Sequence, residues 1–152
     1  MALPTHLTLQ IVTPDRLVVR EEVDEVEVPG ANGYFGVLPG HTPMLAALTV
    51  GELWYRKGSE RTYVAIAYGF AEVLPDGVTI LAQLAERADQ IDVTRAEAAL
   101  KRAQERLAGP GEQVDYARAR TALQKALSRL EVSSRGGVSP RSAVLNQVRP
   151  QG

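Results

Sequence analysis

The sequence predicts an α+β fold in which an N-terminal antiparallel β-sandwich is followed by a C-terminal antiparallel α-helical hairpin. Up to about residue 90, apolar and polar side chains alternate in short runs, which is the period of half-buried strands. Clusters of Pro, Gly and Asp separate these runs, as is typical of a sandwich. Beyond that point, the apolar residues recur every three or four positions, which is the period of an amphipathic helix.

The predicted strands start with segment 7–11, where every second residue is apolar. The further strand segments are 25–28, 34–38, 52–56, 62–67, 69–74 and 78–84. The acidic stretch 21–25 has the pattern of the solvated face of a sheet. Between the last two segments, Pro75 presets the first turn dihedral and Gly77 accepts a positive φ. We therefore expect a hairpin there, and we expect Gly77→Val to destabilise it.

Two helices form the predicted hairpin. Residues Thr94-Arg95-Ala96-Glu97 fit a capping box, in which the hydroxyl and the carboxylate each satisfy a free backbone amide. Gly109-Pro110-Gly111 ends the first helix, because Pro110 cannot continue the hydrogen-bond ladder. The apolar stripes of the two helices are Ala96, Leu100, Ala103 and Leu107, and then Tyr116, Ala119, Leu123, Leu127 and Leu130. Because the stripes are rich in alanine, we expect each helix to bury little area and the hairpin to dock only marginally.

The chain divides into a sandwich at 1–90, a hairpin at 91–132 and a tail at 133–152. The tail contains three arginines, no acid and no apolar periodicity, so we expect it to be disordered and assign it no function. The net charge of -1 is uneven: residues 1–91 hold 6 Lys/Arg against 12 Asp/Glu, and residues 92–152 hold 11 against 6. This asymmetry predicts two regions with different partners and argues against a uniformly basic nucleic-acid binder.

Composition and motifs exclude most catalytic classes. None of the 152 residues is cysteine, and two histidines alone rarely build a zinc site, so we expect no metal. There is no secretion signal and no apolar run near the roughly 18 residues of a membrane span, so we expect a soluble, cytoplasmic protein. A P-loop is absent, and the glycines at 30–36 have the wrong spacing for a dinucleotide loop. No nucleophile accompanies His41, so we predict no catalytic residue.

Basic residues form one stripe on each predicted helix. Their spacing of 7 and then 4 is shared by Arg95, Arg102 and Arg106 and by Arg118, Lys125 and Arg129. We expect both stripes to lie away from the apolar stripes, where they suit an anionic ligand or an acidic protein surface. The alternative is an ordinary solvated face, which is the default for the charged outer side of a surface helix, and both interpretations stay open.

One segment resembles a known family. The string at 33–45, GYFGVLPGHTPML, is similar to the glycine turn and Pro-Gly-His-x-Pro segment of the epsilon subunit of bacterial F-type ATP synthases. It is followed in family order by Gly69-Phe70, the strand 78–81, Ile91-Asp92 and two helices rich in Ala, Arg and Leu. The resemblance covers roughly residues 5–132.

The resemblance implies a non-catalytic rotor subunit whose sandwich consists of two five-stranded sheets and binds the gamma subunit and the c-subunit ring. Asn32, Gly33, Tyr34 and His41 match the rotor-contact edge, and Tyr34 stands where the family has an acidic residue. From the same resemblance, we expect the hairpin to extend in some states toward the alpha and beta subunits and to hinder ATP hydrolysis. We also expect the complex to couple proton flow to ATP synthesis at the cytoplasmic face of the bacterial inner membrane, which this chain would meet only indirectly.

The resemblance also implies a regulatory ATP site, although no cofactor is required. Residues Ile91-Asp92-Val93-Thr94-Arg95-Ala96 are similar to the family's ATP-binding motif. The other matching positions are Glu86, Arg102 and Arg129, with Lys125 in place of an arginine. In such a site, carboxylates accept from adenine or ribose and arginines pair with phosphates. The alternative is that Asp92 is a helix N-cap and Arg95 a surface charge.

A second class of function is a free-standing β-sandwich binding module with a helical interaction arm. It leaves the strong patterning of the hairpin without a purpose. Association with the gamma subunit distinguishes the two.

Overall fold

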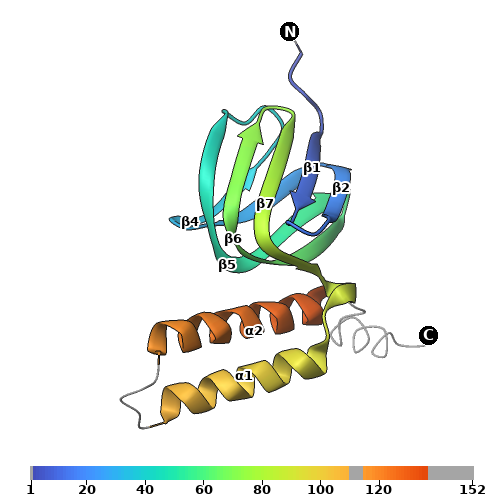
Figure 1. Cartoon of the computed structure of the whole chain (residues 1–152). Coiled ribbons are helices and arrows are strands. Elements are labelled where there is room, and N and C mark those ends of the chain that lie inside the picture. The colour runs from blue at the N-terminus through green and yellow to red at the C-terminus, as the bar shows by residue number, and fades with distance from the viewer. Residues whose placement is uncertain (1, 110–114, 137–152) are drawn as a thin grey trace, which may run out of the picture.

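The computed structural model describes residues 2–109 and 115–136. It confirms the predicted fold class, with a sandwich of strands followed by a helical hairpin (Figure 1). The described strands are β1 (Leu7–Val12), β2 (Leu17–Val23), β3 (Glu25–Gly30), β4 (Gly33–Val37), β5 (Met44–Lys57), β6 (Glu60–Leu74) and β7 (Gly77–Arg87). The helices are the 3₁₀ turn η1 (Ala88–Gln90), α1 (Val93–Ala108) and α2 (Tyr116–Gly136).

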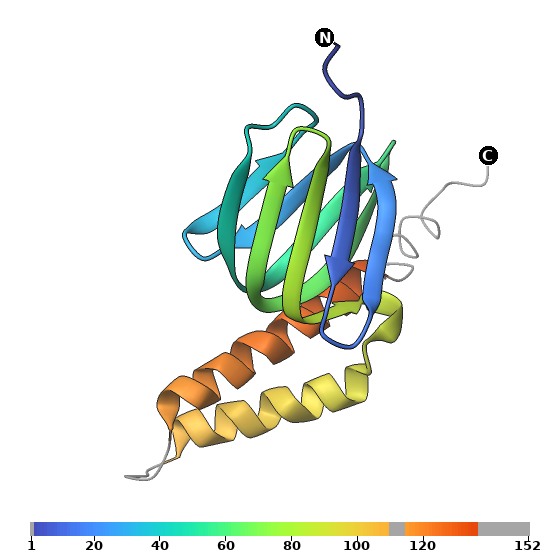
Figure 2. The ribbon, with the colours of Figure 1, turned by 45° about the horizontal axis from the view of Figure 1, so that its top comes forward.

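The described strands form one continuous hydrogen-bonded sheet in the order β2-β1-β7-β6-β5-β3-β4. The resemblance implied a sandwich of two five-stranded sheets. The sandwich is confirmed, and its two faces share one hydrogen-bonded ladder. β5 and β6 have 14 and 15 residues and curve around the core, so the ladder continues from one face of the sandwich to the other (Figures 1 and 2). Neighbouring strands are antiparallel except β1 and β7, which are parallel.

A bend in the middle of β6 makes this curvature possible. Tyr68 and Gly69 have φ values of 56° and 128°, which is a region that only glycine enters without strain. A Cβ on Gly69 would collide with the carbonyl oxygen of Leu81. The predicted segments 62–67 and 69–74 are therefore two halves of one strand.

The core contains the alternating side chains that the sequence predicted. The fully buried large residues are Leu7, Leu9, Ile11, Leu53, Ile66, Ile80, Val23, Val26, Val28, Val37, Val64 and Val73. β2 was not among the predicted segments. Two adjacent residues within it, Val18 and Val19, are both buried, which breaks the period-two pattern. The predicted segment 52–56 is the end of the much longer β5.

The hairpin between β6 and β7 is confirmed, since Leu74 pairs with Gly77. The expected role of Gly77 is wrong, because its φ is not positive. Gly77 instead begins β7 beside β1, and a Cβ there would lie 3.2 Å from the carbonyl oxygen of Thr8. Gly77→Val is therefore opposed by a close backbone approach.

The predicted capping box at Thr94 is wrong, because Asp92 is the N-cap of α1. Its carboxylate accepts a hydrogen bond from the backbone N–H of Arg95 (3.0 Å), and Thr94 lies inside the first turn. At the other end, Gly109 donates to the carbonyl of Glu105 (3.0 Å). The predicted stop at Gly109 is confirmed, whereas Pro110 and Gly111 lie outside the described residues.

α2 continues beyond the predicted end of the hairpin at residue 132 and reaches Gly136. Val132 is fully buried against Ala65 and Ile91, which holds this end of the helix on the sandwich. In the next turn, Arg135 forms an ion pair with Glu131 (2.7 Å). Residues 133–136 are therefore helical, and the rest of the predicted tail, 137–152, lies outside the described residues.

The hairpin docks through α2, which packs on β5, β6 and β7, while α1 packs on α2. The buried residues of the two helices are Ala96, Ala103, Ala119, Ala126, Ser128 and Val132. The predicted stripe of α2 is wrong at Tyr116 and Leu127, which are about half exposed. No helix in the described ranges is long and apolar enough to cross a membrane.

Candidate functional site

A cavity of about 580 Å³ lies where the sandwich meets the hairpin. It is lined by Arg16, Glu86, Gln90, Asp92, Arg95, Ala96, Ala99, Arg102 and Arg129. These residues come from the β1–β2 turn, the end of β7, η1, both helices and the N-cap of α1. The sandwich and the hairpin therefore complete this cavity together.

An ion pair between Glu86 and Arg129 forms one wall of the cavity. Arg129 Nη2 donates to Glu86 Oε1 at 2.7 Å, and Arg129 Nε donates to the same oxygen at 3.1 Å. Both side chains are only about a quarter exposed, at 25% and 23%. Charge-assisted bonds with two contacts are among the stronger polar interactions. This pair ties α2 to the end of β7.

The first turn of α1 forms a second wall. Asp92 satisfies one of the free amides there, so its role as an N-cap is confirmed. The remaining free amides give a helix N-terminus a partial positive charge, which favours an anion nearby. Arg95 and Arg102 project from α1 toward the same space and line it.

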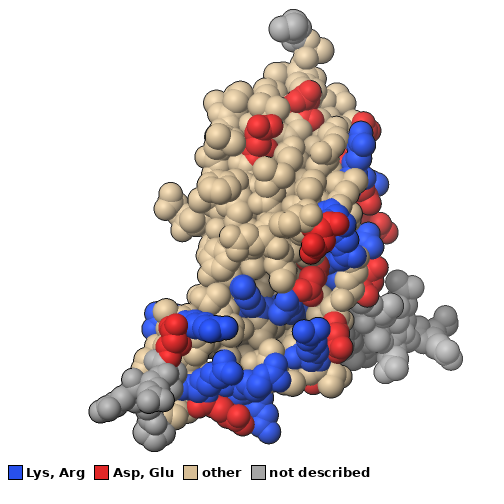
Figure 3. Space-filling model, viewed as in Figure 1, with Lys and Arg blue, Asp and Glu red and all other residues tan. Residues whose placement is uncertain are grey.

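The cavity carries an excess of positive charge, with four arginines against two acids. Among the described residues, only Arg129 of these arginines forms an ion pair with a carboxylate. Arg16, Arg95 and Arg102 form no ion pair with a carboxylate of the described chain. Figure 3 shows Lys and Arg side chains gathered around the hollow between the helices and the sandwich. Such a site suits a polyanion, for which guanidinium groups supply paired donors.

Six of the eight predicted ATP-site residues line this one cavity: Glu86, Asp92, Arg95, Ala96, Arg102 and Arg129. Ile91 does not, because it is buried against Val132. Lys125 does not either, because its ammonium lies over the ring of Tyr68, 5.7 Å from the centroid. Lys125 and Arg129 face the sandwich, so the alternative interpretation of the basic stripes, an ordinary solvated face, is wrong for these two residues.

The sequence analysis missed three lining residues: Arg16, Gln90 and Ala99. Ala99 follows Arg95 by one helical turn, so the helical period alone was sufficient to find it. Arg16 and Gln90 are 74 positions apart and meet only through the sheet.

The predicted rotor-contact residues lie in two loops. Asn32 lies in the exposed turn between β3 and β4, and Gly33 and Tyr34 begin β4, with 52% of the Tyr34 surface exposed. The Tyr34 hydroxyl donates to Glu52 Oε2 (2.9 Å), and burial, the largest effect, raises the pKa of this phenol. His41 lies in the β4–β5 loop, and no hydrogen bond between it and the β3–β4 turn occurs in the described parts of the chain.

The sandwich exposes a further surface that the sequence analysis missed. Leu45, Phe70 and Leu81 are each more than half exposed. Phe70 lies directly opposite Leu81 on β7 and opposite Ala47 on β5, so these side chains share one face of the sheet. We call Leu45, Ala47, Phe70 and Leu81 the apolar patch. A contiguous patch of this kind marks an interaction surface.

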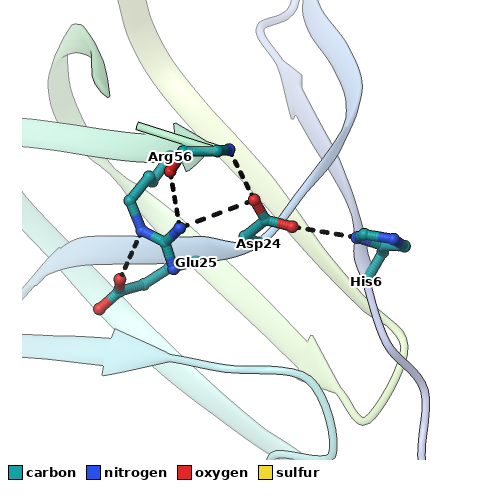
Figure 4. A network of polar contacts seen from close by, with 5 residues as sticks. His6, Asp24, Glu25 and Arg56 are labelled. Carbon is teal, nitrogen blue, oxygen red and sulfur yellow. Dashed lines mark hydrogen bonds and ion pairs between the residues drawn. The ribbon is translucent and has the colours of Figure 1, made fainter. Parts of the chain in front are cut away.

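A second polar cluster is structural. Asp24 accepts from the backbone N–H of Gly58 (2.7 Å) and contacts His6 Nδ1 (3.0 Å) and Arg56 Nη1 (3.6 Å) (Figure 4). Arg56 also donates to Glu25 (3.2 Å). The cluster joins the segment before β1, the β2–β3 junction and the β5–β6 turn.

Comparison with known proteins shows which family the chain resembles. The beta-sandwich domain of the ATP synthase Delta/Epsilon chain matches residues 6–88, and the long alpha-helix domain of the same family matches residues 89–134. The ATP synthase epsilon chain of Koribacter versatilis is 54% identical over 102 residues, covering 67% of this chain and 72% of that relative. The epsilon chain of Syntrophobacter fumaroxidans is 58% identical over 102 residues, covering 67% and 76%.

Among solved structures, a chain of the Euglena gracilis mitochondrial ATP synthase, in its OSCP/F1/c-ring assembly, is similar with a TM-score of 0.74 and 26% identity, covering 86% of this chain and 82% of that one. Both parts of the fold thus have counterparts in one family, in the same order along the chain. This chain belongs to the ATP synthase delta/epsilon chain family, and its relatives there are epsilon chains.

Proposed function

We propose that this chain is a non-catalytic central-stalk subunit of the F-type ATP synthase, which couples proton-driven rotation to ATP synthesis. The observation that carries the proposal is that both domains of this family occur in one chain. The sandwich exposes the apolar patch, and the hairpin packs elsewhere on the sandwich through mostly alanine side chains. The Euglena assembly contains F1 and the c-ring, and we assign this chain similar surroundings. It meets the cytoplasmic face of the bacterial inner membrane only through the complex.

The sandwich is the rotor-binding part in this proposal. The apolar patch suits burial against the gamma subunit, because exposed Leu and Phe side chains gain free energy when a partner covers them. The turn at Asn32, Gly33 and Tyr34, together with His41, is assigned to the c-ring and gamma contact. Glu52 lies 2.9 Å from the Tyr34 hydroxyl, so a carboxylate remains at this turn although the family's acidic position holds Tyr34.

The hairpin is the regulatory part. It docks through small side chains and the Glu86–Arg129 pair, and the buried Ser128 hydroxyl has no hydrogen-bond partner among the described residues. An unpaired buried hydroxyl weakens docking. The docked and released states of the hairpin therefore differ little in free energy. In the released state, the hairpin is free to reach the alpha and beta subunits and hinder ATP hydrolysis.

We infer that the cavity binds ATP as a regulatory ligand and not as a required cofactor. The three arginines that form no ion pair in the described chain support this, as does the first turn of α1. Because the lining comes from both parts of the fold, a ligand there favours the docked hairpin over the released one. The sandwich and the hairpin then act as a sensor of ATP.

The proposal is tested by measuring ATP hydrolysis by a complex of alpha, beta and gamma subunits. The full chain is compared with a version that ends at Gln90, and binding of each to gamma is measured as the control for folding. We expect both to bind gamma and only the full chain to inhibit hydrolysis. Inhibition by neither, with tight binding of both, removes the inhibitory role and leaves a structural coupling subunit. If the full chain fails to bind gamma, the free-standing binding module is the better assignment.

A further inference from the structure

Arg16 is the only cavity-lining arginine in the described chain that comes from the sandwich. The turn that carries it is closed by backbone, since the N–H of Thr13 donates to the Arg16 carbonyl at 3.0 Å. Its side chain reaches across the cavity edge, where Nη2 donates to Gln90 Oε1 at 3.1 Å. The same oxygen accepts from the backbone N–H of Arg87 (3.3 Å), which fixes the amide in place. Arg16 is therefore held at the cavity by a defined partner.

That partner is neutral, so this contact does not compensate the charge of Arg16. Arg56, Arg87, Arg129 and Arg135 each pair with a carboxylate in the described residues, and Arg16 does not. One Nη2 contact to an amide leaves most of the guanidinium's donors available. An arginine in this state, at the edge of a positively charged cavity, is ready to bind an anion.

Lys125 leaves a gap that Arg16 is placed to fill. Lys125 matches a position where the resembling ATP-binding chains have arginine, but its ammonium lies over Tyr68 and outside the cavity lining. Without it, α2 contributes only Arg129, and that guanidinium is already paired with Glu86. The sandwich supplies a further guanidinium, that of Arg16, to the cavity lining.

We propose that Arg16 is a phosphate-binding residue of the cavity, so that a bound nucleoside triphosphate bridges the sandwich and the hairpin. This inference rests on the proposed ATP site. It makes the site depend on the β1–β2 turn as well as on the hairpin motif. Discrimination by phosphate number follows, because a monophosphate offers fewer oxygens and less charge to a set of arginines spread over three elements.

The test is isothermal titration of ATP and AMP into the full chain, its Arg16→Gln variant and its Arg20→Gln variant. Arg20 is a matched control, because it is exposed, lies on β2 and does not line the cavity. Loss of one charge-assisted hydrogen bond predicts that Arg16→Gln weakens ATP binding roughly tenfold or more. We expect a smaller loss for AMP and no change for Arg20→Gln. Circular dichroism of each variant checks the fold.

The outcomes separate this inference from the ATP site itself. Tight ATP binding by the unaltered chain with no loss in Arg16→Gln overturns the role of Arg16 and leaves the ATP site standing. An equal loss for ATP and AMP overturns the discrimination by phosphate number, because Arg16 then acts on a group that both nucleotides share. Absence of ATP binding by the unaltered chain overturns both. Titration with inorganic tripolyphosphate shows whether the arginines recognise the phosphates without the nucleoside.

Discussion

At the scale of single residues, Asp24 illustrates how a part-exposed carboxylate stabilises a junction. The backbone N–H of Gly58 is the main group that holds the pKa of Asp24 below its ordinary value of 3.8, and the His6 hydrogen bond and the Arg56 charge act in the same direction. A lowered pKa means that the ionised carboxylate is more stable in the folded chain than in the unfolded one. Three distant segments therefore meet at one charged group.

We predict that Asp24→Asn removes part of the acid sensitivity of the fold. A carboxylate with a lowered pKa stabilises the folded chain above its ordinary pKa, and this stability is lost as pH falls through the folded pKa. Thermal unfolding measured from pH 7 to pH 3 will show a steeper loss below about pH 4 for the unaltered chain than for the variant. Asp15→Asn is the control, since Asp15 is exposed in the β1–β2 turn. Equal slopes for all three chains contradict the prediction.

At the scale of elements, the start of α1 shows how two overlapping sequence patterns are resolved. Both Asp92 and Thr94 are good N-cap residues, and Thr94 with Glu97 completes a capping box in the sequence. The chain begins its helical turn at Val93, because Ile91 is buried against the sandwich and fixes where the preceding segment lies. Packing of one neighbour thus selects the cap.

We predict that Asp92→Ala destabilises α1 by about 1 kcal/mol, which is the usual cost of losing an N-cap side chain. Thr94→Ala is the matched control and is expected to change little, because Thr94 lies within the helix. Hydrogen exchange of the α1 amides, without ligand, measures both. A larger effect from Thr94→Ala than from Asp92→Ala contradicts the cap at Asp92 and favours the capping box at Thr94.

At the scale of the whole molecule, the curvature of β6 decides how the sandwich closes. Gly69 lies where β6 bends, and its backbone approaches β7 so closely that a side chain has no room. The bend lets one strand border both faces of the core (Figure 2). The same strand carries the apolar patch at Phe70 and supports α2 on its other part.

We predict that Gly69→Ala lowers the free energy of unfolding by about 2 kcal/mol or more, because it places a Cβ on a residue with positive φ and against the backbone of Leu81. Gly36→Ala is the control, since Gly36 has no positive φ and no atom near the position of a new Cβ. Urea unfolding of both variants measures the difference. A similar small effect from the two substitutions means that β6 bends without help from Gly69.

Local patterns in the sequence determined that strands precede two helices, the buried alternation of β1, the β6–β7 hairpin and the stop at Gly109, because neighbours within a few positions govern these features. The resemblance also identified most of the cavity residues. Only the tertiary structure decided the parallel β1–β7 pairing, the extent of β6, the cap at Asp92 and the meeting of Arg16 with Gln90. Contacts between residues 74 positions apart depend on strand order and register, and short-range periodicity carries no information about either.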